Sequence, residues 1–260
     1  MKLKFIGVGS AFTTSDYYQS NLLITASNGK NLLVDCGTDI RFSLNESCGI
    51  TEVNLCNKID AVYISHLHSD HIGGMEWMAF QTYFNPNHKR PQLFMEQTLM
   101  HELWDNSLVA GLGCIEGKCM HLTDYFTCRT LAGNGSFTWE GICFQLVRMP
   151  HICAGYKNFY SYGLIINDLV NNSPAVFFTT DTQYRPDIIA HEIETASVIF
   201  HDCETSGFKS AVHAHYQDLL KFPREIRQKM WLYHYQPNPG FNPETDGFKG
   251  FVIKGQEFEF

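Results

Sequence analysis

A cluster of potential metal ligands follows directly on a short apolar run in the first third of the chain. The run from Lys58 to Ser65 predicts a strand, and the residues after it read His-Leu-His-Ser-Asp-His. His66 and His68 can point the same way after the strand, whereas Asp70 and His71 turn toward a second position. Imidazole and carboxylate ligands in this mixture suit zinc first, with manganese or iron as alternatives. The motif therefore predicts a dinuclear metal site at the end of a strand.

The residues after this motif decide against an accidental cluster on an exposed loop. A short motif carries a false-positive risk that only its structural context removes. Here Gly73 and Gly74 allow close approach of the backbone, and the segment from Met75 to Phe80 begins an apolar helix. The order strand, ligand loop, helix is the context that such a site needs.

Three further candidate ligands lie after apolar, strand-like runs. His151 follows the run 142–149, Asp181 follows the run 175–180, and His234 follows the run 230–233. Taken alone, each is more often a structural residue, because a histidine beside an apolar run is usually a core or rim residue and an aspartate often begins a turn. Ligands at strand ends would be positioned by a rigid scaffold.

Together these segments resemble the metallo-β-lactamase superfamily, whose signature HxHxDH residues 66–71 match in full. The opening from Met1 to Phe12 is similar to that of the phosphodiesterase branch, which includes ribonuclease Z and the cyclic-phosphate hydrolases. The segment from Asn31 to Gly37 resembles the strand that carries an aspartate beneath the metal site in this family. The resemblance implies an α/β fold, a four-layer αβ/βα sandwich that forms one domain over residues 1–260, with the metals at one edge.

The resemblance also implies two divalent metal ions, zinc first and manganese as an alternative, held by two ligand sets. These sets are His66, His68, His151 and Asp181 for one ion, and Asp70, His71, Asp181 and His234 for the other. Two such ions bridged by a carboxylate turn a shared water into a hydroxide nucleophile near neutral pH. The implied reaction is therefore the attack of a metal-bridged hydroxide on a phosphodiester.

A leaving alkoxide needs a proton, and a histidine opposite the nucleophile can supply it. His215 resembles the proton donor of the family, and Asp202 resembles the carboxylate that orients it, although the ribonuclease Z group usually carries Glu there. His213 is a second candidate, and both histidines could instead lie on the surface at the start of a helix. Asp35 either ties down a metal ligand or is a turn residue before Gly37.

The net charge of the chain limits the range of possible substrates. The formal net charge is −8 and the basic residues are dispersed, whereas proteins that grip polynucleotides use many Lys and Arg contacts to phosphates. The segment between His151 and Asp181 is also too short for the long arm with which bacterial ribonuclease Z proteins grip transfer RNA. The chain instead resembles the anti-Pycsar phosphodiesterases, which implies a small 3′,5′-cyclic nucleotide as substrate and a linear monophosphate as product.

Other activities stay open on the sequence alone. A ribonuclease Z-like enzyme that processes tRNA 3′ ends, a thioester or lactone hydrolase, and a nucleotide sensor without turnover could share this fold. The base preference, the type of cyclic phosphate and the native metal are open as well. Tyr17, Tyr18, Phe84 or Tyr156 could stack on a base, or could be core or interface residues.

The remaining features indicate an intracellular protein. No apolar run approaches the ~20 residues of a membrane span, and Lys2 and Lys4 alternate with apolar residues as in a strand rather than a signal peptide. We therefore expect a cytoplasmic location, that of the host cell if the gene is viral. The nine cysteines are odd in number, which favours reduced thiols over a disulfide framework. A structural zinc at Cys114, Cys119, His121 and Cys128 is an alternative to buried apolar cysteines.

Hydrophobic periodicity predicts the elements of the sandwich. We expect strands at 3–8, 22–26, 32–35 and 61–65, strands that start at Ile142, Tyr162, Val176 and Val198, and helices at 72–83 and 96–108. The segment 110–135 is expected to be irregular, as a lid or a subunit contact. Relatives are often homodimers, and residues 104–128 are where we expect a partner to contribute.

Overall fold

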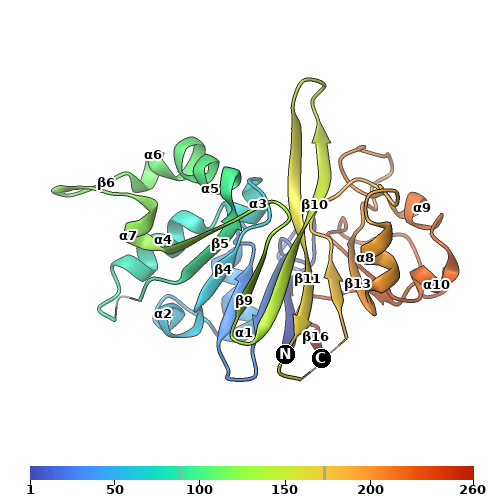
Figure 1. Cartoon of the computed structure of the whole chain (residues 1–260), viewed down its shortest axis with the longest axis horizontal. Helices are drawn as coiled ribbons and strands as arrows, with labels where there is room; N and C mark the ends of the chain where they lie inside the picture. The colour runs from blue at the N-terminus through green and yellow to red at the C-terminus, as the bar shows by residue number, and fades with distance from the viewer. Residues whose placement is uncertain (88, 172–173) are drawn as a thin grey trace.

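The chain forms two seven-stranded sheets that pack against each other through a shared apolar core (Figure 1). The structure, a computed structural model, describes residues 1–87, 89–171 and 174–260. The first sheet contains, in spatial order, β16 (Glu257–Glu259), β1 (Lys2–Gly7), β2 (Asn21–Thr25), β3 (Asn31–Val34), β4 (Ala61–Tyr63), β5 (Gln92–Glu96) and β8 (Thr127–Leu131). The second contains β15 (Gly250–Phe251), β14 (Met230–Tyr233), β13 (Val198–Asp202), β12 (Val176–Phe178), β11 (Asn158–Asp168), β10 (Ile142–Cys153) and β9 (Ser136–Trp139).

Helices cover the outer face of each sheet and complete four layers. On the first sheet these are α1 (Ile40–Cys48), α2 (Leu55–Lys58), α3 (Ser69–Ile72), α4 (Met75–Tyr83), α5 (Gln97–Leu103), the π-helical turn η1 (Trp104–Leu108), α6 (Val109–Leu112) and α7 (Leu122–Tyr125). On the second they are α8 (Ala190–Thr195), α9 (Tyr216–Leu219) and α10 (Arg224–Arg227). A small hairpin of β6 (Cys114–Ile115) and β7 (Lys118–Cys119) extends from the first helical layer. The expected αβ/βα sandwich is confirmed.

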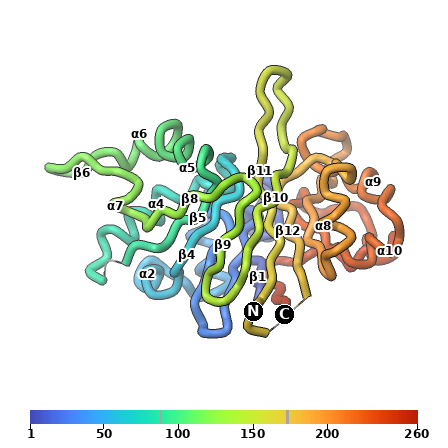
Figure 2. The backbone as a smooth tube through the Cα atoms, in the orientation of Figure 1, coloured from blue at the N-terminus to red at the C-terminus, as the bar shows by residue number. Residues whose placement is uncertain are grey.

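Strand β1 shows how side-chain alternation builds the layers. Leu3 and Phe5 face the core between the sheets, whereas Ile6 belongs to the core under the helices of the first sheet. The ring of Phe5 lies 4.9 Å from that of Phe200 in the other sheet. Lys4 points outward and pairs with Glu257 of β16 at 3.1 Å. The smooth trace in Figure 2 shows this N-terminal strand near the centre of the molecule, close to both termini.

Several expected boundaries are wrong. The helix expected over 72–83 is interrupted after α3, where the backbone N–H of Gly74 donates to the Cys36 carbonyl at 2.9 Å. The chain is closely packed at this point, because a Cβ on Gly74 would lie 2.5 Å from the Gly37 carbonyl oxygen. The segment 110–135, expected to be irregular, contains α7 and β8, and β8 extends the first sheet beside β5. Strand β10 continues past the expected end at residue 149 to Cys153, with a register shift at His151.

The paired strands β10 and β11 form a long hairpin that projects beyond the body of the molecule (Figure 1). The antiparallel ladder between β10 and β11 continues from the second sheet into the projection, where it ends with the pair of Cys153 and Asn158. Two strands of the second sheet therefore extend into the projecting hairpin and stay paired out to its tip. Among the described residues, no helix is long and apolar enough to cross a lipid bilayer.

Gly163 of β11 is required for the approach of the next strand. A Cβ at this position would meet the backbone oxygens of Thr179 at 2.7 Å and Phe178 at 2.8 Å. We expect Gly163→Ala to lower the free energy of unfolding by about 1–3 kcal/mol, the usual cost of overpacking. Urea denaturation measures this loss, and Gly207→Ala is the matched control because nothing lies within 4 Å of its added Cβ. Equal unfolding midpoints for the two variants would contradict the expectation.

Candidate metal centre

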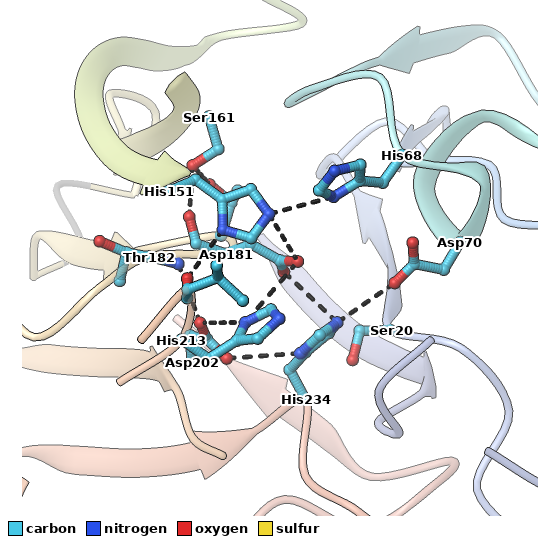
Figure 3. A network of polar contacts seen from close by, with 12 residues as sticks. Ser20, His68, Asp70, His151, Ser161, Asp181, Thr182, Asp202, His213 and His234 are labelled. Carbon is cyan, nitrogen blue, oxygen red and sulfur yellow. Dashed lines mark hydrogen bonds and ion pairs between the residues drawn. The ribbon is translucent and has the colours of Figure 1, made fainter. Parts of the chain in front are cut away.

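The seven expected ligands converge at one edge of the two sheets, and Figure 3 shows five of them, His68, Asp70, His151, Asp181 and His234. In the first sheet, the loop after β4 supplies His66 and His68, and α3 supplies Asp70 and His71. The second sheet supplies His151 at the irregularity in β10, Asp181 just after β12 and His234 just after β14. Thr180 and His234 have positive φ angles of 56° and 62°, an uncommon conformation for residues other than glycine. These sharp turns at the strand ends are compatible with strain stored at a functional site.

The first ligand group surrounds His68. Its Nδ1 lies 3.1 Å from Nε2 of His66 and 3.0 Å from Nε2 of His151. Asp181 completes the group, with Oδ2 at 3.7 Å from the His66 nitrogen and 3.8 Å from the His151 nitrogen. Ligand atoms at tetrahedral corners about 2.0–2.1 Å from a zinc ion are separated by about 3.3 Å, which falls inside this range.

The second group shares Asp181. Nε2 of His71 lies 3.3 Å from Oδ2 of both Asp70 and Asp181. Nε2 of His234 lies 3.4 Å from Asp70 and 3.4 Å from the other oxygen of Asp181. The two groups contain the same residues as the two sets that the family resemblance implies. Oδ2 of Asp181 faces histidines of both groups, as an oxygen of a bridging carboxylate would, and Oδ1 faces His234.

Hydrogen bonds on the far side of the rings orient the lone pairs inward. The Nδ1–H of His151 donates to the Val212 carbonyl at 2.9 Å, and that of His71 donates to Asp35 at 2.8 Å. In the His151 ring Nε2 is then the unprotonated nitrogen that faces the centre, and in the His71 ring Nε2 is the nitrogen left to face it. The buried Nε2 of His71 and Oδ1 of Asp181 have no hydrogen-bond partner among the described residues. Buried polar atoms are rarely left unpaired, so the donor set fits divalent metal ions.

Burial keeps the first group in its metal-binding form. It lowers the pKa values of His66, His68 and His151, so that these imidazoles are neutral at neutral pH. A metal ion requires the neutral imidazole, because only that form offers a lone pair.

The second group lies in a strongly negative environment. Burial would lower the pKa of His71, but Asp181, Asp70 and Asp35 outweigh it and raise that pKa well above its ordinary value. The pKa of His234 is likewise raised to about 10, with Asp181 as the strongest of the influences that oppose burial. The same carboxylates would stabilise a divalent cation among these side chains.

Asp35 holds two parts of the ligand loop. Its carboxylate accepts hydrogen bonds from Nδ1 of His71 and from the backbone N–H and the hydroxyl of Ser65, each at 2.8 Å. The Ser65 hydroxyl in turn lies 3.0 Å from Nδ1 of His66, and because it donates to Asp35 it accepts from that ring. The alternative that Asp35 ties down metal ligands therefore agrees with the structure, and its φ of 64° aims the carboxylate.

We expect Asp35→Asn to lower metal affinity by about 10–100-fold, because outer partners of this kind orient the ligands and strengthen their basicity. Competition with a chromophoric chelator measures the affinity. Asp16→Asn, on an exposed loop, is the control that should bind metal like the parent protein. Unchanged affinity in Asp35→Asn would show that the ligand loop is held without this carboxylate.

A third cluster joins Asp202 and His213 to Asp181 and His234. Nδ1 of His213 lies 2.9 Å from Oδ2 of Asp202, and the His213 ring stacks on that of His234 at 4.9 Å (Figure 3). Burial would lower the pKa of His213, but Asp202 and Asp181 outweigh it and raise that pKa. This cluster therefore presents a histidine with a carboxylate behind it, directly beside the metal groups.

The prediction that His215 is the proton donor does not agree with the structure. His215 begins α9, where its Nδ1 accepts the backbone N–H of Gln217 at 3.2 Å and its Nε2 faces the Ser206 carbonyl oxygen at 3.0 Å. Both ring nitrogens therefore serve the backbone, and His215 is absent from all three clusters found in the described part of the chain. Asp202 contacts His213 instead. His213, the second candidate for the proton donor, therefore lies beside Asp202 and the ligand groups.

Some supporting residues were not anticipated. The hydroxyl of Ser161 donates to the backbone oxygen of Asp181 at 2.5 Å and accepts from the hydroxyl of Thr180 (Figure 3). The backbone N–H of Thr182 donates to Asp202 at 2.8 Å. No motif marks these residues, because their proximity depends on strand register. Cys114, Cys119, His121 and Cys128, considered for a structural zinc, form no ligand cluster among the described residues.

Comparison with known proteins identifies the family to which the chain belongs. A family model described as "Anti-Pycsar protein Apyc1" matches residues 1–258. The chain belongs to the anti-Pycsar Apyc1 family. Apyc1 of Bacillus phage BSP38 is 31% identical over 264 residues, which cover 99% of this chain and 97% of the relative. Apyc1 of Saccharibacillus brassicae is 33% identical over 242 residues, which cover 92% of this chain and 91% of the relative.

Solved structures similar to this Apyc1 family member agree on the fold. The metallo-β-lactamase fold protein YhfI from Bacillus subtilis superimposes with a TM-score of 0.71 at 18% identity, over 99% of this chain and 98% of that chain. The short form of human tRNase Z gives a TM-score of 0.68 at 15% identity, over 100% and 99% of the two chains. The metallo-β-lactamase fold is confirmed, and with the family it supports a metal-dependent phosphodiesterase.

Proposed function

We propose that this chain is a dinuclear metal phosphodiesterase that opens 3′,5′-cyclic mononucleotides to linear monophosphates. The observation that carries the proposal is the pair of ligand groups that share Asp181, in a chain of the Apyc1 family. Two bridged divalent ions of the zinc class would supply a nucleophilic hydroxide at neutral pH and neutralise charge that develops on the phosphoryl oxygens. His66, His68 and His151 would hold one ion and Asp70, His71 and His234 the other.

The chain's own residues perform the remaining steps. Asp181 holds the two halves of the centre together, because its Oδ2 faces His66 of the first group at 3.7 Å and His71 of the second group at 3.3 Å. His213 gives the leaving ribose oxygen its proton from Nε2, since its Nδ1 is directed at Asp202. Asp202 positions that ring and also lies 3.3 Å from Nδ1 of His234, which links the proton donor to the second ligand group.

A small substrate suits the charge of the molecule. With a net charge of −8, the chain lacks the excess of cations that long polynucleotides require. The phosphate of a cyclic nucleotide needs only the metals and the few groups around them. We also propose that residues 1–260 are one domain, because β16 near the C-terminus pairs with β1 in the same sheet. A homodimer with a contribution from residues 104–128 and a cytoplasmic location stay predictions.

The test is a turnover assay with zinc-loaded or manganese-loaded protein. We would incubate it separately with 3′,5′-cyclic AMP, GMP, CMP and UMP, with a 2′,3′-cyclic nucleotide, with a tRNA precursor and with a thioester, and separate the products by chromatography. Linear monophosphates from one or more 3′,5′-cyclic nucleotides are expected. Cleavage of the tRNA precursor or the thioester alone, by protein that holds two metals per chain, would overturn the proposal.

A further inference from the structure

A cavity of about 350 Å³ opens beside the first ligand group. Its lining includes His66, His68 and His151, so one side of the cavity is the metal centre itself. The ligand loop, helix α5 and the β10–β11 hairpin supply the remaining walls. Glu96, the last residue of β5, and Leu99 and Glu102 of α5 lie on one wall, and Arg148, Lys157 and Tyr160 of the hairpin lie on another.

The volume indicates a small ligand. Small-molecule sites usually measure about 300–1,000 Å³, so this cavity lies near the lower end and suits a single nucleoside rather than an oligonucleotide. Tyr160, Tyr162 and Leu99 provide the aromatic and aliphatic surface on which a base can pack. None of the aromatic residues that the sequence suggested for base stacking lines this cavity.

The charges on the walls balance. Glu96 is engaged in the wall itself, where it accepts the backbone N–H groups of Thr98 and Leu99 at 2.8 and 3.1 Å. The guanidinium of Arg148 lies 3.5 Å from the centre of the Tyr160 ring and stacks on it. Two carboxylates and two cations thus line the cavity, which favours a neutral organic group over a polyanion.

An ion pair joins the two walls. Nζ of Lys157 on the turn of the hairpin lies 3.6 Å from Oε1 of Glu102 on α5. The two side chains are half to one-third exposed, so the contact is weak and can open and close at little cost. It spans from the projecting hairpin to the helix, across the cavity that both elements line.

We propose that this cavity is the nucleoside subsite of the enzyme, and that Glu102 and Lys157 close it over the base and ribose. The inference rests on the proposed function, because the metal centre would hold the phosphate of the same molecule. His151 connects the two places: it lines the cavity, and its ring lies 5.1 Å from that of His213. A phosphate at the centre can therefore have its ribose in the cavity and its leaving oxygen near His213.

The test fills the cavity without touching the ligands. Thr98→Trp places a large ring in the cavity from an exposed position on α5, and Gln97→Trp, also exposed but outside the lining, is the matched control. Each variant is assayed with the cyclic nucleotide that the parent protein cleaves best and with methyl p-nitrophenyl phosphate, which has no nucleoside. Since base stacking contributes about 1–3 kcal/mol, we expect Thr98→Trp to raise KM for the cyclic nucleotide by roughly 10–100-fold.

The assay with methyl p-nitrophenyl phosphate distinguishes loss of the nucleoside subsite from damage to the metal centre. For Thr98→Trp its kcat/KM should stay within about twofold of the Gln97→Trp value, because nothing at the metal ligands changes. Equal losses for both substrates, or a KM for the cyclic nucleotide that matches the control, would overturn the subsite. If the parent protein cleaves the small diester but no cyclic nucleotide, the proposed function fails instead.

A binding measurement covers the case in which turnover is absent or Thr98→Trp does not fold. Calorimetry with linear nucleoside monophosphates gives the affinity of the subsite directly, and Glu102→Gln removes the ion pair with little change in shape. We expect Glu102→Gln to weaken monophosphate binding severalfold while its affinity for inorganic phosphate is retained. Identical monophosphate affinity in Glu102→Gln and parent protein would contradict the assignment, whether or not the chain turns over cyclic nucleotides.

Discussion

Asp181→Asn is expected to abolish the dinuclear centre and lower kcat/KM by roughly 10³-fold or more. The substitution keeps the shape of the side chain but removes the charge that faces both ligand groups. Oδ2 of Asp181 lies 3.7 Å from Nε2 of His66 in the first group and 3.3 Å from Nε2 of His71 in the second, so both ions would lose a bridging anion. Loss of the metals forfeits several kcal/mol of transition-state stabilisation, at 1.36 kcal/mol for each tenfold in rate.

Two measurements check this prediction. Metal analysis after gel filtration should give less than one equivalent of metal per chain, and the turnover assay should give the loss of rate. Asp187→Asn is the control in the same loop, because that carboxylate is exposed and pairs only with Arg185 among the contacts described, at 2.8 Å. If Asp181→Asn retains two tightly bound metals and near-normal turnover, the bridging role is wrong.

His213→Gln is expected to lower kcat by about 10²–10⁴-fold while the metals stay bound, which is the usual effect of removing a general acid. Its Nδ1 lies 2.9 Å from Asp202, and the ring stacks on metal-ligand candidate His234 at 4.9 Å. The effect should shrink for p-nitrophenyl diesters, because a nitrophenolate leaves without a proton. Rates for the two substrate types and the metal content of the variant are the required measurements.

His215→Asn is the matched control. Asparagine also begins helices well, so the variant keeps the cap of α9 while it removes the imidazole. Its kcat should stay within about threefold of the parent value, since the ring contacts only backbone groups in the described structure. A large loss in His215→Asn with normal activity in His213→Gln would return the proton donor to the residue first chosen from the sequence.

The candidate ligand groups could be predicted because their signals are local. Residues 66–71 carry the motif in consecutive positions, and His151, Asp181 and His234 follow apolar runs that the family resemblance orders. The four-layer arrangement follows from the same alternation of strands and helices, and both were found in the structure.

The proton donor could not be chosen from the sequence for a physical reason. His213 and His215 are two residues apart in the sequence. The position at which the next helix begins decides which of them faces the candidate metal centre and which of them hydrogen-bonds to the backbone at the helix start. Only the actual start of α9, where His215 receives the Gln217 N–H, decides which is which. Helix boundaries are among the least reliable sequence signals.

The long hairpin and the cavity beside it were missed for a related reason. Pro150 lies in β10, which ordinarily argues for a strand end, but the register shift at this point accommodates it. Strand pairing between β10 and β11 then carries Arg148, Lys157 and Tyr160 to the side of α5. Such proximity depends on tertiary register, which no local pattern records.

The most direct test of the central claim is ³¹P NMR of metal-loaded protein with a 3′,5′-cyclic nucleotide in water enriched in oxygen-18. The account predicts that the cyclic diester signal is replaced by that of a linear monophosphate with one oxygen-18 on phosphorus, because the nucleophile is water and the bond that breaks joins phosphorus to the ribose oxygen. No turnover in a preparation with two metals per chain would contradict the account. A product without label on phosphorus would contradict it as well.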